Sequence, residues 1–462
     1  MTATSGGADR HADLVVVGAG AAGLAAARAG ARRGARVLLV QQGPLGGDCT
    51  FTGCVPSKAL IDAARRRLPF DRAIAAARRA VDVVAATETD DVLQREGVDV
   101  AHGWATFREP GVLEVDGTLA RARRIVIATG AHPAVPPIDG LGDVDHLTTE
   151  TVWGLDAAPT SLAVLGGGAT GCELAQAFAR LGSTVTLVEA LDRVLPHEEP
   201  DASAVVSEAL SADGVSVRTA DAVVRVEPLA RNGGARLNLA GGGTLEVQRV
   251  LVAAGRTGTI QGLGLDAAGV ETTRGFVATA DTLATTASGV WAAGDVTGRL
   301  QFTHAADEMG RVAAANALGR SGRRRFRTDA VPWVTFTDPE VGRVGITETE
   351  AAERGGRVAY LPMTEVDRAI AAGETRGFVK LIAGPRRVLR NTGGGRVLGA
   401  TIVAGRAGEM IHEPALAMRT DMFAGRLAQT VHAYPTWSVA VRQAAAQLFM
   451  ETGGRQATAA HR

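Results

Sequence analysis

The sequence has little cysteine, no net charge and no long apolar run. Three cysteines in 462 residues are too few for the disulfide scaffold of a small secreted domain. The 49 basic and 49 acidic residues cancel, so no electrostatic footprint for nucleic acid or a membrane surface is present. No apolar stretch is long enough to span a bilayer, and the polar start, Met1 to His11, lacks the core of a secretory signal. These absences predict a cytoplasmic protein without a nucleic-acid or membrane partner.

Lysine is almost missing as well. Only Lys58 and Lys380 occur, and every other basic residue is an arginine. A chain that uses arginine almost everywhere is expected to keep lysine where a compact ammonium is needed. Lys58 lies four residues after Cys54, which directs attention to that segment.

The length favours two or three domains, since 462 residues exceed what one core usually holds. The first begins with an apolar run, Leu14 to Val17, which predicts a buried parallel strand. A glycine-rich turn follows, then an alanine-rich helix to about Arg33 and a strand from Arg36 to Val40. The glycines of this turn, a GxGxxG fingerprint, are Gly18, Gly20 and Gly23. In a βαβ unit, such glycines let the backbone and the helix N-terminus approach a pyrophosphate.

The same pattern returns between Ser161 and Val188. A predicted strand ends at Leu165, a helix is expected from Glu173 to Leu181, and the next strand begins at Thr184. The glycines of this second fingerprint are Gly166, Gly168 and Gly171. Two fingerprints in full βαβ context predict two dinucleotide-binding domains.

The remaining chain is organised by turn signals. Proline-rich residues 132–140 predict a linker out of the first domain, and the glycine clusters at 233–234 and 241–243 predict β-hairpins. Basic residues 323–327 mark a boundary with a solvated charge run. From Val331 onward strands and helices mix without a fingerprint, which predicts a third domain. The polar tail after Met450 is predicted to be disordered.

The segment from Gly46 to Lys58 holds a cysteine pair, Cys49 and Cys54. Pro56 suits the first turn of a helix that would run to about Arg67. Cys54 would then lie at a helix N-terminus, where the dipole lowers the pKa of a thiol. Lys58, one turn further on, would face the same side. The pattern therefore predicts a redox-active pair, while Cys172 is expected to be a small buried hydrophobe.

These residues resemble the class I pyridine nucleotide-disulfide oxidoreductases, the family of dihydrolipoyl dehydrogenase, glutathione reductase and mercuric reductase. The resemblance covers nearly the whole chain, including Ala128-Thr129-Gly130, Ala293-Gly294-Asp295 and the segment from Val331 to Glu340. It implies an α/β fold with two Rossmann-like domains, for FAD and NAD(P), and a C-terminal α+β dimerisation domain in a homodimer. The implied boundaries are 1–150 and 271–330 for the two parts of the FAD domain, 151–270 for the NAD(P) domain, 331–450 for the dimerisation domain, and 451–462 for the tail.

The resemblance also implies roles for individual residues. Cys54 would lie beside the flavin, Cys49 would be the interchange thiol, and Lys58 would approach flavin N5, paired with Glu173. The implied cofactor contacts are Gly18, Gly20, Gly23, Gln41, Lys58, Thr129, Gly130, Gly166, Gly168, Gly171, Glu189, Gly255, Gly294, Asp295, Thr303, His304 and Ala305. No resident metal site is predicted.

The choice of nicotinamide depends on Glu189, twenty-three residues past Gly166. A carboxylate there binds the ribose 2′-hydroxyl and repels a 2′-phosphate, so NADH is favoured, with NADPH as the alternative if Arg193 swings inward. Gln41 holds the equivalent place in the first unit, where the family has glutamate. Its amide can still bind FAD, because it donates and accepts hydrogen bonds.

The family pattern breaks near the C-terminus. The family places a His before Pro-Thr as a base contributed by the partner subunit, with a Glu five positions beyond it. Here these positions hold Tyr434 and Val439. A tyrosine, with a pKa near 10, is a poor base at neutral pH. His432, two residues earlier, is the alternative base, although a structural role is expected for it.

Mercuric reductases also carry a tyrosine in this neighbourhood, and residues 375–380 resemble theirs. They end in a cysteine pair, whereas residues 451–462 contain no cysteine. The predicted protein is therefore a mercuric-reductase-like NAD(P)H oxidoreductase. Its electrons would pass through FAD and the Cys49–Cys54 disulfide to a metal ion, a quinone or an unusual disulfide. Two alternatives remain: a dihydrolipoyl dehydrogenase with His432 as base, and a flavin-binding redox sensor that turns over rarely.

Overall fold

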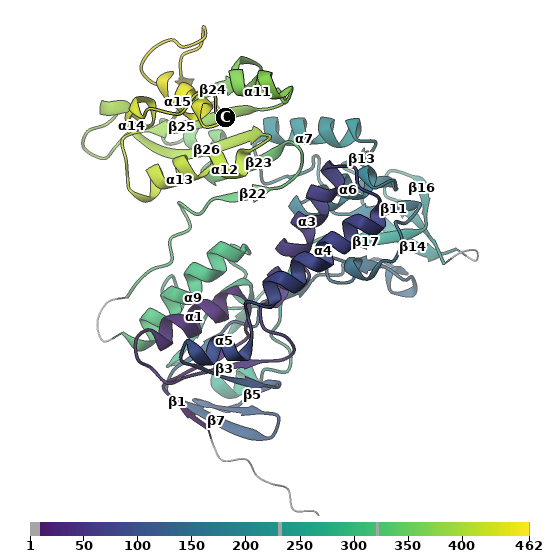
Figure 1. Ribbon diagram of the computed structural model, residues 1–462, viewed down its shortest axis with the longest axis vertical. Helices are drawn as coiled ribbons and strands as arrows, with labels where there is room; N and C mark the ends of the chain where they lie inside the picture. The colour runs from purple at the N-terminus through teal and green to yellow at the C-terminus, as the bar shows by residue number, and fades with distance from the viewer. Residues whose placement is uncertain (1–9, 230–232, 320–322, 462) are drawn as a thin grey trace, which may run out of the picture.

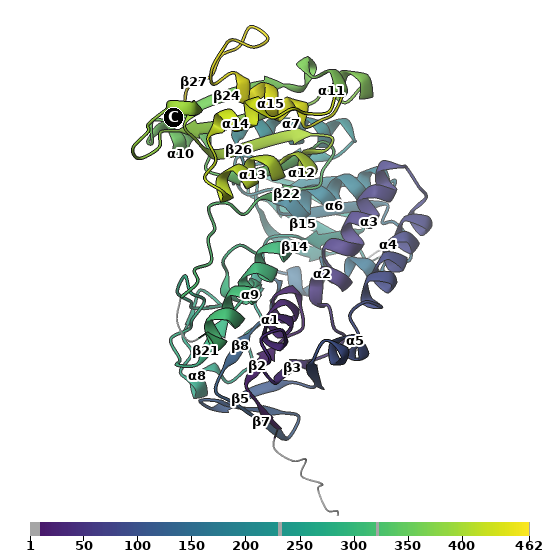
Figure 2. The same cartoon turned by 60° about the vertical axis from the view of Figure 1, so that its left-hand side comes forward.

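A computed structural model describes residues 10–229, 233–319 and 323–461; the predicted polar start up to residue 9 lies outside this part. Three parts follow one another in space (Figures 1 and 2). The first lies at the bottom of both views and the third, green and yellow, at the top; the second lies on the right in Figure 1 and between the other two in Figure 2. Within the described residues, no helix is both long and apolar enough to cross a bilayer.

The first part is built on a parallel five-stranded sheet in the order β21-β8-β2-β3-β4. These strands are Val290–Ala292, Ile125–Ile127, Leu14–Val17, Val37–Gln41 and Val98–His102. Helices α1 (Ala21–Ala31) and α9 (Thr303–Leu318) pack on one face. The other face packs on a second sheet, made of β1 (Arg10–Ala12), β7 (Thr118–Ala122), β6 (Val112–Val115) and β5 (Ala105–Glu109). Strands from both ends of a 300-residue segment therefore share one sheet, as a domain in two parts requires.

The second part repeats this plan. Its parallel sheet has the order β10-β17-β11-β12-β13, made of Leu147–Thr148, Arg249–Val252, Ser161–Leu165, Thr184–Val188 and Ser216–Arg218. Helices α6 (Ala169–Arg180) and α7 (Pro200–Ala212) share its core. An antiparallel sheet of β14 (Val223–Pro228), β15 (Ala235–Leu239) and β16 (Gly243–Val247) covers the other face. The hairpins predicted around the glycine clusters are these strands.

Two connectors join the first two parts. Strand β9 (Ala131–Pro133) leads out of the first part and pairs antiparallel with β18 (Arg256–Gly258), which leads back. Leu263 and Leu265 already pack into the core of the first part, with the short helix α8 (Leu265–Ala268) and the hairpin of β19 (Thr272–Thr273) and β20 (Phe276–Val277) following. The chain therefore returns to the first part before residue 271, the start predicted for the second part of the FAD domain.

The third part is a six-stranded antiparallel sheet in the order β22-β23-β26-β25-β24-β27. Its strands are Trp333–Thr335, Glu340–Gly345, Arg396–Ala404, Phe378–Gly384, Arg357–Pro362 and Thr458–Ala459. Its helices are α10 (Glu348–Ala352), α11 (Asp367–Ala372), α12 (Ala407–Met410), α13 (His412–Arg419), α14 (Ala424–Gln429) and α15 (Val439–Ala446). The prediction of an α/β fold with a C-terminal α+β domain is confirmed.

The tail corrects one prediction. Strand β27 pairs with β24, with Thr458 opposite Val358 and Ala459 opposite Arg357, so the segment is not disordered. Without it β24 would be an edge strand with unpaired backbone groups, and the polar tail satisfies them.

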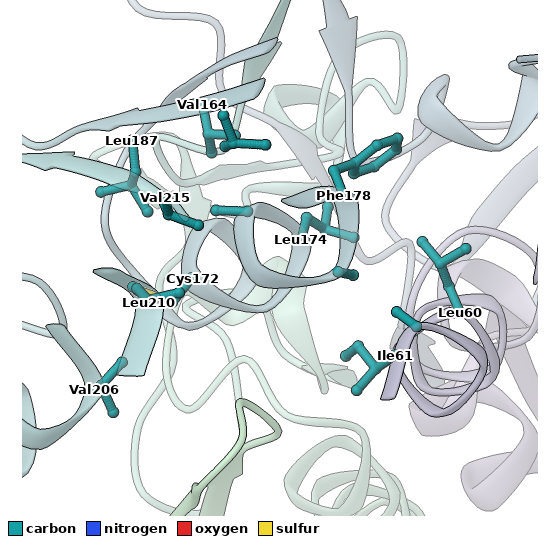
Figure 3. Close-up of a cluster of buried hydrophobic side chains, with 14 of the residues drawn as sticks. Leu60, Ile61, Val164, Cys172, Leu174, Phe178, Leu187, Val206, Leu210 and Val215 are labelled. Carbon is teal, nitrogen blue, oxygen red and sulfur yellow. The ribbon is translucent and has the colours of Figure 1, made fainter. Parts of the chain in front are cut away.

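The helix that carries Cys54 packs across the first and second parts. Helix α3 (Cys54–Arg65) follows the short α2 (Gly47–Phe51) and precedes α4 (Phe70–Ala85) and α5 (Asp90–Arg95). Leu60 and Ile61 of α3 share a buried cluster with Leu174 and Phe178 of α6 (Figure 3). This apolar contact holds the cysteine helix against the helix of the second fingerprint.

Candidate active site

One cavity of about 1210 Å³ joins the two fingerprints. It runs from Gly18 and Gly20 past Cys49, Cys54 and Lys58 to Gly166, Gly168 and Glu189, and all of these residues line it. The fold therefore brings both predicted dinucleotide sites and the cysteine pair to one continuous space. Two cofactors and a dithiol bound there could pass electrons to one another within a single cavity.

Corresponding glycines of the two fingerprints have the same surroundings. A methyl group at the first glycine would lie 2.3 Å from Ala128 O at Gly18 and 2.5 Å from Ala253 O at Gly166. At the second glycine, a methyl group at Gly20 would come no closer than 3.9 Å to another residue, and one at Gly168 would meet nothing within 4 Å. The first glycines therefore allow the tight turn, and the second leave room for a ligand.

The helices that begin at these turns leave their N-termini free for an anion. Helix α1 has Gly20 at its N-cap and α6 has Gly168, without a side-chain cap or an acidic residue in the first turn. Uncapped N–H groups and the positive end of the helix dipole suit a pyrophosphate. The residues at the first fingerprint therefore fit FAD, and those at the second fit a nicotinamide dinucleotide.

The residues at the ends of β3 and β12 hold the two turns in the same way. Gln41 Oε1 accepts a hydrogen bond from Ala19 N at 2.7 Å, and Glu189 Oε2 accepts one from Gly167 N at 2.7 Å. The Gln41 amide also donates to the carbonyl oxygens of Gln42 and Pro44, which a glutamate could not do. Gln41 therefore fixes the loop and still lines the cavity.

Glu189 is buried and lines the cavity, and its second oxygen accepts a hydrogen bond from Leu191 N at 2.8 Å. Arg193 does not approach it: the guanidinium donates to Pro196 O at 2.9 Å and to Asp192. Asp221 lines the same end of the cavity. Two acidic side chains, Glu189 and Asp221, therefore line this end of the cavity.

The cysteine pair lies where α2 meets α3. Cys54 is the first residue of α3, as predicted, and Cys49 belongs to α2. Both are thiols in this structure, which corresponds to the reduced form of the pair. A hydrogen bond with Cys49 is the main cause that lowers the pKa of Cys54 to about 6, with contributions from Thr303 and Lys58 against the effect of burial. The Cys54 Sγ lies 3.2 Å from Thr303 Oγ1. The pKa of Cys49 is raised by the same hydrogen bond and by burial, so Cys54 is the thiolate.

Lys58 and Glu173 form the predicted pair. The Lys58 Nζ lies 2.9 Å from Glu173 Oε2, and the Glu173 side chain is 5% exposed. The pair joins α3 of the first part to α6 of the second, and both residues line the cavity. A lysine with one short contact to a buried carboxylate is what the shortage of lysine led us to expect.

Arg256 is a site residue that the sequence did not reveal. It extends from β18 and donates to Asp48, the residue before Cys49, and to Ala131 O. Its Nε lies 3.6 Å from Asp295, whose pKa is raised by burial although Arg256 opposes the shift. Arg256 thus links the connector, the cysteine loop and Asp295, one of the predicted cofactor contacts. No motif around it indicates this.

Several other predicted cofactor contacts line the cavity. They are Thr129, Gly130, Gly255, Gly294, Asp295 and Thr303. Four do not line it. Gly23 and Gly171 serve packing instead, because a methyl group there would lie 1.7 Å from Gly18 O and 1.9 Å from Gly166 O.

The other two are His304 and Ala305. Ala305 belongs to α9 and is buried. His304 faces a second cavity, of about 420 Å³, and its Nε2 donates to Pro332 O at 2.6 Å.

Tyr434 and His432 lie in the third part, away from the cavity. Tyr434 is 71% exposed, and its hydroxyl donates to Asp367 at 2.8 Å. That hydrogen bond raises the pKa of Tyr434. The His432 side chain is 5% exposed, with Nε2 3.0 Å from Glu413 and Nδ1 2.9 Å from Thr430 O. Both imidazole nitrogens therefore face oxygen acceptors.

Cys172 is fully buried among apolar side chains of the second part, beside Leu210 in Figure 3. Burial raises the pKa of its thiol. A buried protonated thiol is inert.

A double dinucleotide-binding fold around a dithiol defines a two-cofactor redox enzyme. Residues 12–310 match the pyridine nucleotide-disulphide oxidoreductase model, and residues 331–445 match the dimerisation domain of that group. A mercuric reductase from Streptomyces lividans is 37% identical over 463 residues, covering 94% of this chain and 95% of that protein. A dihydrolipoyl dehydrogenase from Thermus scotoductus is 34% identical over 459 residues, covering 94% and 97%.

Solved structures agree. The Cu(II) complex of RclA from Escherichia coli, described as an HOCl-induced flavoprotein disulfide reductase, superposes with a TM-score of 0.87 at 30% identity, covering 95% of this chain and 99% of that one. LpdA from Mycobacterium tuberculosis gives 0.85 at 30% identity, covering 96% and 100%. The chain belongs to the pyridine nucleotide-disulphide oxidoreductase family. It is therefore a flavoprotein enzyme that uses FAD and a nicotinamide, and its dimerisation domain supports a homodimer.

The acidity of Cys54 gives a first testable prediction. Because its pKa is lowered to about 6, the thiolate persists as pH falls to about 6 and is lost only below that value. In the reduced enzyme, the alkylation rate of the Cys54 peptide with iodoacetamide, followed by mass spectrometry, should rise through a midpoint near 6. A Lys58→Met variant should move the midpoint up by about one pH unit, since an opposite charge is removed. A midpoint between 8 and 9 in the unmodified enzyme, the ordinary range of a free thiol, would contradict the assignment.

Proposed function

We propose that this enzyme passes electrons from a nicotinamide, through FAD and the Cys49–Cys54 pair, to a thiophilic metal ion such as Hg(II) or Cu(II). The observation that carries the proposal is Tyr434. It holds the family's base position, and its hydroxyl donates to Asp367, which raises its pKa. It is therefore a protonated phenol at neutral pH and does not accept a proton.

A metal-ion acceptor does not need a base at that position. Exchange with a disulfide substrate requires a group that manages thiol protons, whereas a thiophilic metal binds thiolate sulfur directly and displaces protons to solvent. The low pKa of Cys54 suits this chemistry. The two thiolates give up two electrons and become a disulfide, while one Hg(II) becomes Hg(0) or two Cu(II) become two Cu(I).

FAD held at the first fingerprint, by Gly18 and Gly20 and the N-terminus of α1, would supply the two-electron chemistry that restores the dithiol. The residues of this chain prepare that step. Lys58 and Thr303 stabilise the Cys54 thiolate, and the uncapped N-termini of α1 and α6 face the two nucleotide sites. The names of the relatives point the same way: they include a mercuric reductase, and RclA was solved with Cu(II).

The second candidate is a dihydrolipoyl dehydrogenase. It is favoured by the relative of that name and by the similarity to LpdA. It needs His432 as base, but both nitrogens of His432 face groups of the third part, Glu413 and Thr430 O, and neither is directed at a substrate. We therefore assign His432 a structural role. A redox sensor, the third candidate, would reduce its flavin and then fail to turn over.

An acceptor panel tests the proposal. With NADH and then NADPH as donor, turnover is measured with Hg(II), Cu(II), a quinone, lipoamide, glutathione disulfide and oxygen. We expect the metal ions to sustain the fastest turnover. Fast lipoamide turnover that a His432→Ala variant abolishes would establish the dehydrogenase instead, and reduction without turnover on any acceptor would establish the sensor.

For the nicotinamide we propose NADH, because Glu189 would repel a 2′-phosphate and Arg193 is held elsewhere. A Glu189→Gln variant should lower the preference for NADH over NADPH about tenfold, measured as the ratio of the two kcat/KM values. The turn should survive, since Gln41 makes the equivalent hydrogen bond to Ala19 N in the first unit. A ratio that stays constant in a normally folded variant would remove Glu189 as the selecting residue.

A further inference from the structure

The ammonium of Lys58 has a third neighbour besides Glu173 and Ser57. Its Nζ lies 4.7 Å from the centroid of the Phe336 ring. A cation over an aromatic face is attracted by the ring quadrupole. The ring also packs on the buried cluster of the second part, so its position is fixed.

The backbone of Phe336 contacts the partner of Lys58. The Phe336 N–H donates to Glu173 Oε1 at 2.8 Å, while Oε2 of the same carboxylate binds Lys58 at 2.9 Å. One residue of the third part thus holds both members of the pair: the carboxylate by its N–H and the ammonium by its ring.

The segment that carries Phe336 is attached to α6 at a second point. One turn beyond Glu173, Gln176 accepts a hydrogen bond from Asp338 N at 2.8 Å and donates to Asp338 O at 2.9 Å. Helix α6 in turn packs against α3, as Figure 3 shows for Leu174 and Leu60. The third part is therefore connected through α6 and Phe336 to the residues beside Cys54.

We propose that Phe336 is a positioning residue that fixes Lys58 and Glu173 beside Cys54 and so makes the redox centre depend on docking of the third part. The inference concerns the flavin side of the dithiol and does not depend on which acceptor the enzyme reduces. Phe336 does not touch the reacting sulfur atoms; it acts through Lys58.

The groups that act on Cys54 come from four other elements besides its own. Cys49 of α2 and Thr303 of α9 hydrogen-bond to its sulfur, and Lys58 of α3 attracts the thiolate. Glu173 of α6 repels it, as does Asp295 in the turn after β21. Without the Phe336 ring, Lys58 would lose the attraction of the aromatic face and would be held less firmly beside Cys54, while Glu173 would stay. The thiolate would then lose stabilisation, and a higher pH would be needed to form it.

The test uses the reduced holoenzyme and the pH dependence of Cys54 alkylation. A Phe336→Leu variant, which keeps the N–H and an apolar side chain, should move the midpoint up by about half a pH unit. A Phe336→Tyr variant, which keeps the ring, should restore the midpoint of the unmodified enzyme.

Gln176→Met is the matched control. It removes the hydrogen bonds between Gln176 and the backbone of Asp338 without touching Lys58, while the ion pair between Arg180 of α6 and Asp338 stays, so the midpoint should stay unchanged. A shift in Gln176→Met as large as that in Phe336→Leu would show that docking alone is responsible, and no shift in Phe336→Leu would overturn the proposal. Thermal unfolding of each variant establishes that the comparison is made on folded protein.

Discussion

Replacing Cys49 by serine should lower metal-ion turnover on the order of a thousandfold while the flavin is still reduced by NADH at its normal rate. The reason is that a dithiol can deliver two electrons by forming a disulfide, whereas one thiol cannot. Cys49 is the half-buried member on α2, and its partner begins α3. The measurement is stopped-flow reduction of the flavin by NADH, followed by steady-state turnover with Hg(II).

Serine is the informative substitution at this position. The hydrogen bond from Cys49 is the main cause of the low pKa of Cys54, and a hydroxyl can donate in its place. In Cys49→Ser the alkylation midpoint of Cys54 should therefore stay near that of the unmodified enzyme, whereas in Cys49→Ala it should rise. Both variants should lose turnover equally. Substantial metal-ion turnover in Cys49→Ser would show that electrons leave the flavin without passing through the pair.

Local patterns predicted the parts of this molecule that depend on local geometry. The two βαβ units were predicted because a glycine turn between a buried strand and a helix is readable over about thirty residues. Gly20 and Gly168 are open towards the cavity as that pattern requires. The helix start at Cys54 was readable from Pro56 for the same reason. The shortage of lysine singled out Lys58, which pairs with Glu173.

The sequence could not reveal contacts between distant segments. Phe336 reaches the redox centre from the loop after β22, and Arg256 reaches it from a connector. Phe336 lies in the family-like segment from Val331 to Glu340, but nothing in the sequence of either segment indicates a contact with Lys58 or with Asp48. The pairing of the tail with β24 was missed because the polar composition of the tail indicates only that it prefers solvent. It does not indicate that β24, far away in the sequence, has an edge free for pairing. Helix α6 begins at Ala169 rather than Glu173, since Gly168 ends the turn and the helix follows directly.

The contacts of His432 bear on which residue of the C-terminal segment could act as a base. The sequence offered it as an alternative base, two residues before Tyr434, although a structural role was expected for it. In the structure its two nitrogens face Glu413 and Thr430 O, and its side chain is buried. These contacts support the structural role that we propose for His432, with Tyr434 at the family's base position.

Restoring the missing dyad is the second experiment with a large expected effect. The double variant Tyr434→His, Val439→Glu should raise turnover with dihydrolipoamide and NAD about a hundredfold, because a positioned base contributes at least that factor in proton transfer. Val439 is the first residue of α15, and a carboxylate is stabilised at the N-terminus of a helix. It is also buried, so the glutamate must pair with the new histidine to be tolerated.

That requirement makes the two substitutions interdependent and supplies the controls. Val439→Glu alone should be destabilised, with its carboxylate buried and unpaired, whereas Tyr434→His alone should be stable and only weakly active, because the exposed Tyr434 side chain contributes one hydrogen bond, to Asp367. Tyr434→His, Val439→Gln keeps the shape without the charge and should fall short of the double variant. If a folded double variant reduces its flavin normally and still shows no gain with dihydrolipoamide, the missing base is not what excludes thiol substrates. The shape of the acceptor site around Cys49 would then decide which acceptors the enzyme reduces. The metal-ion proposal would lose the observation at Tyr434 on which it rests.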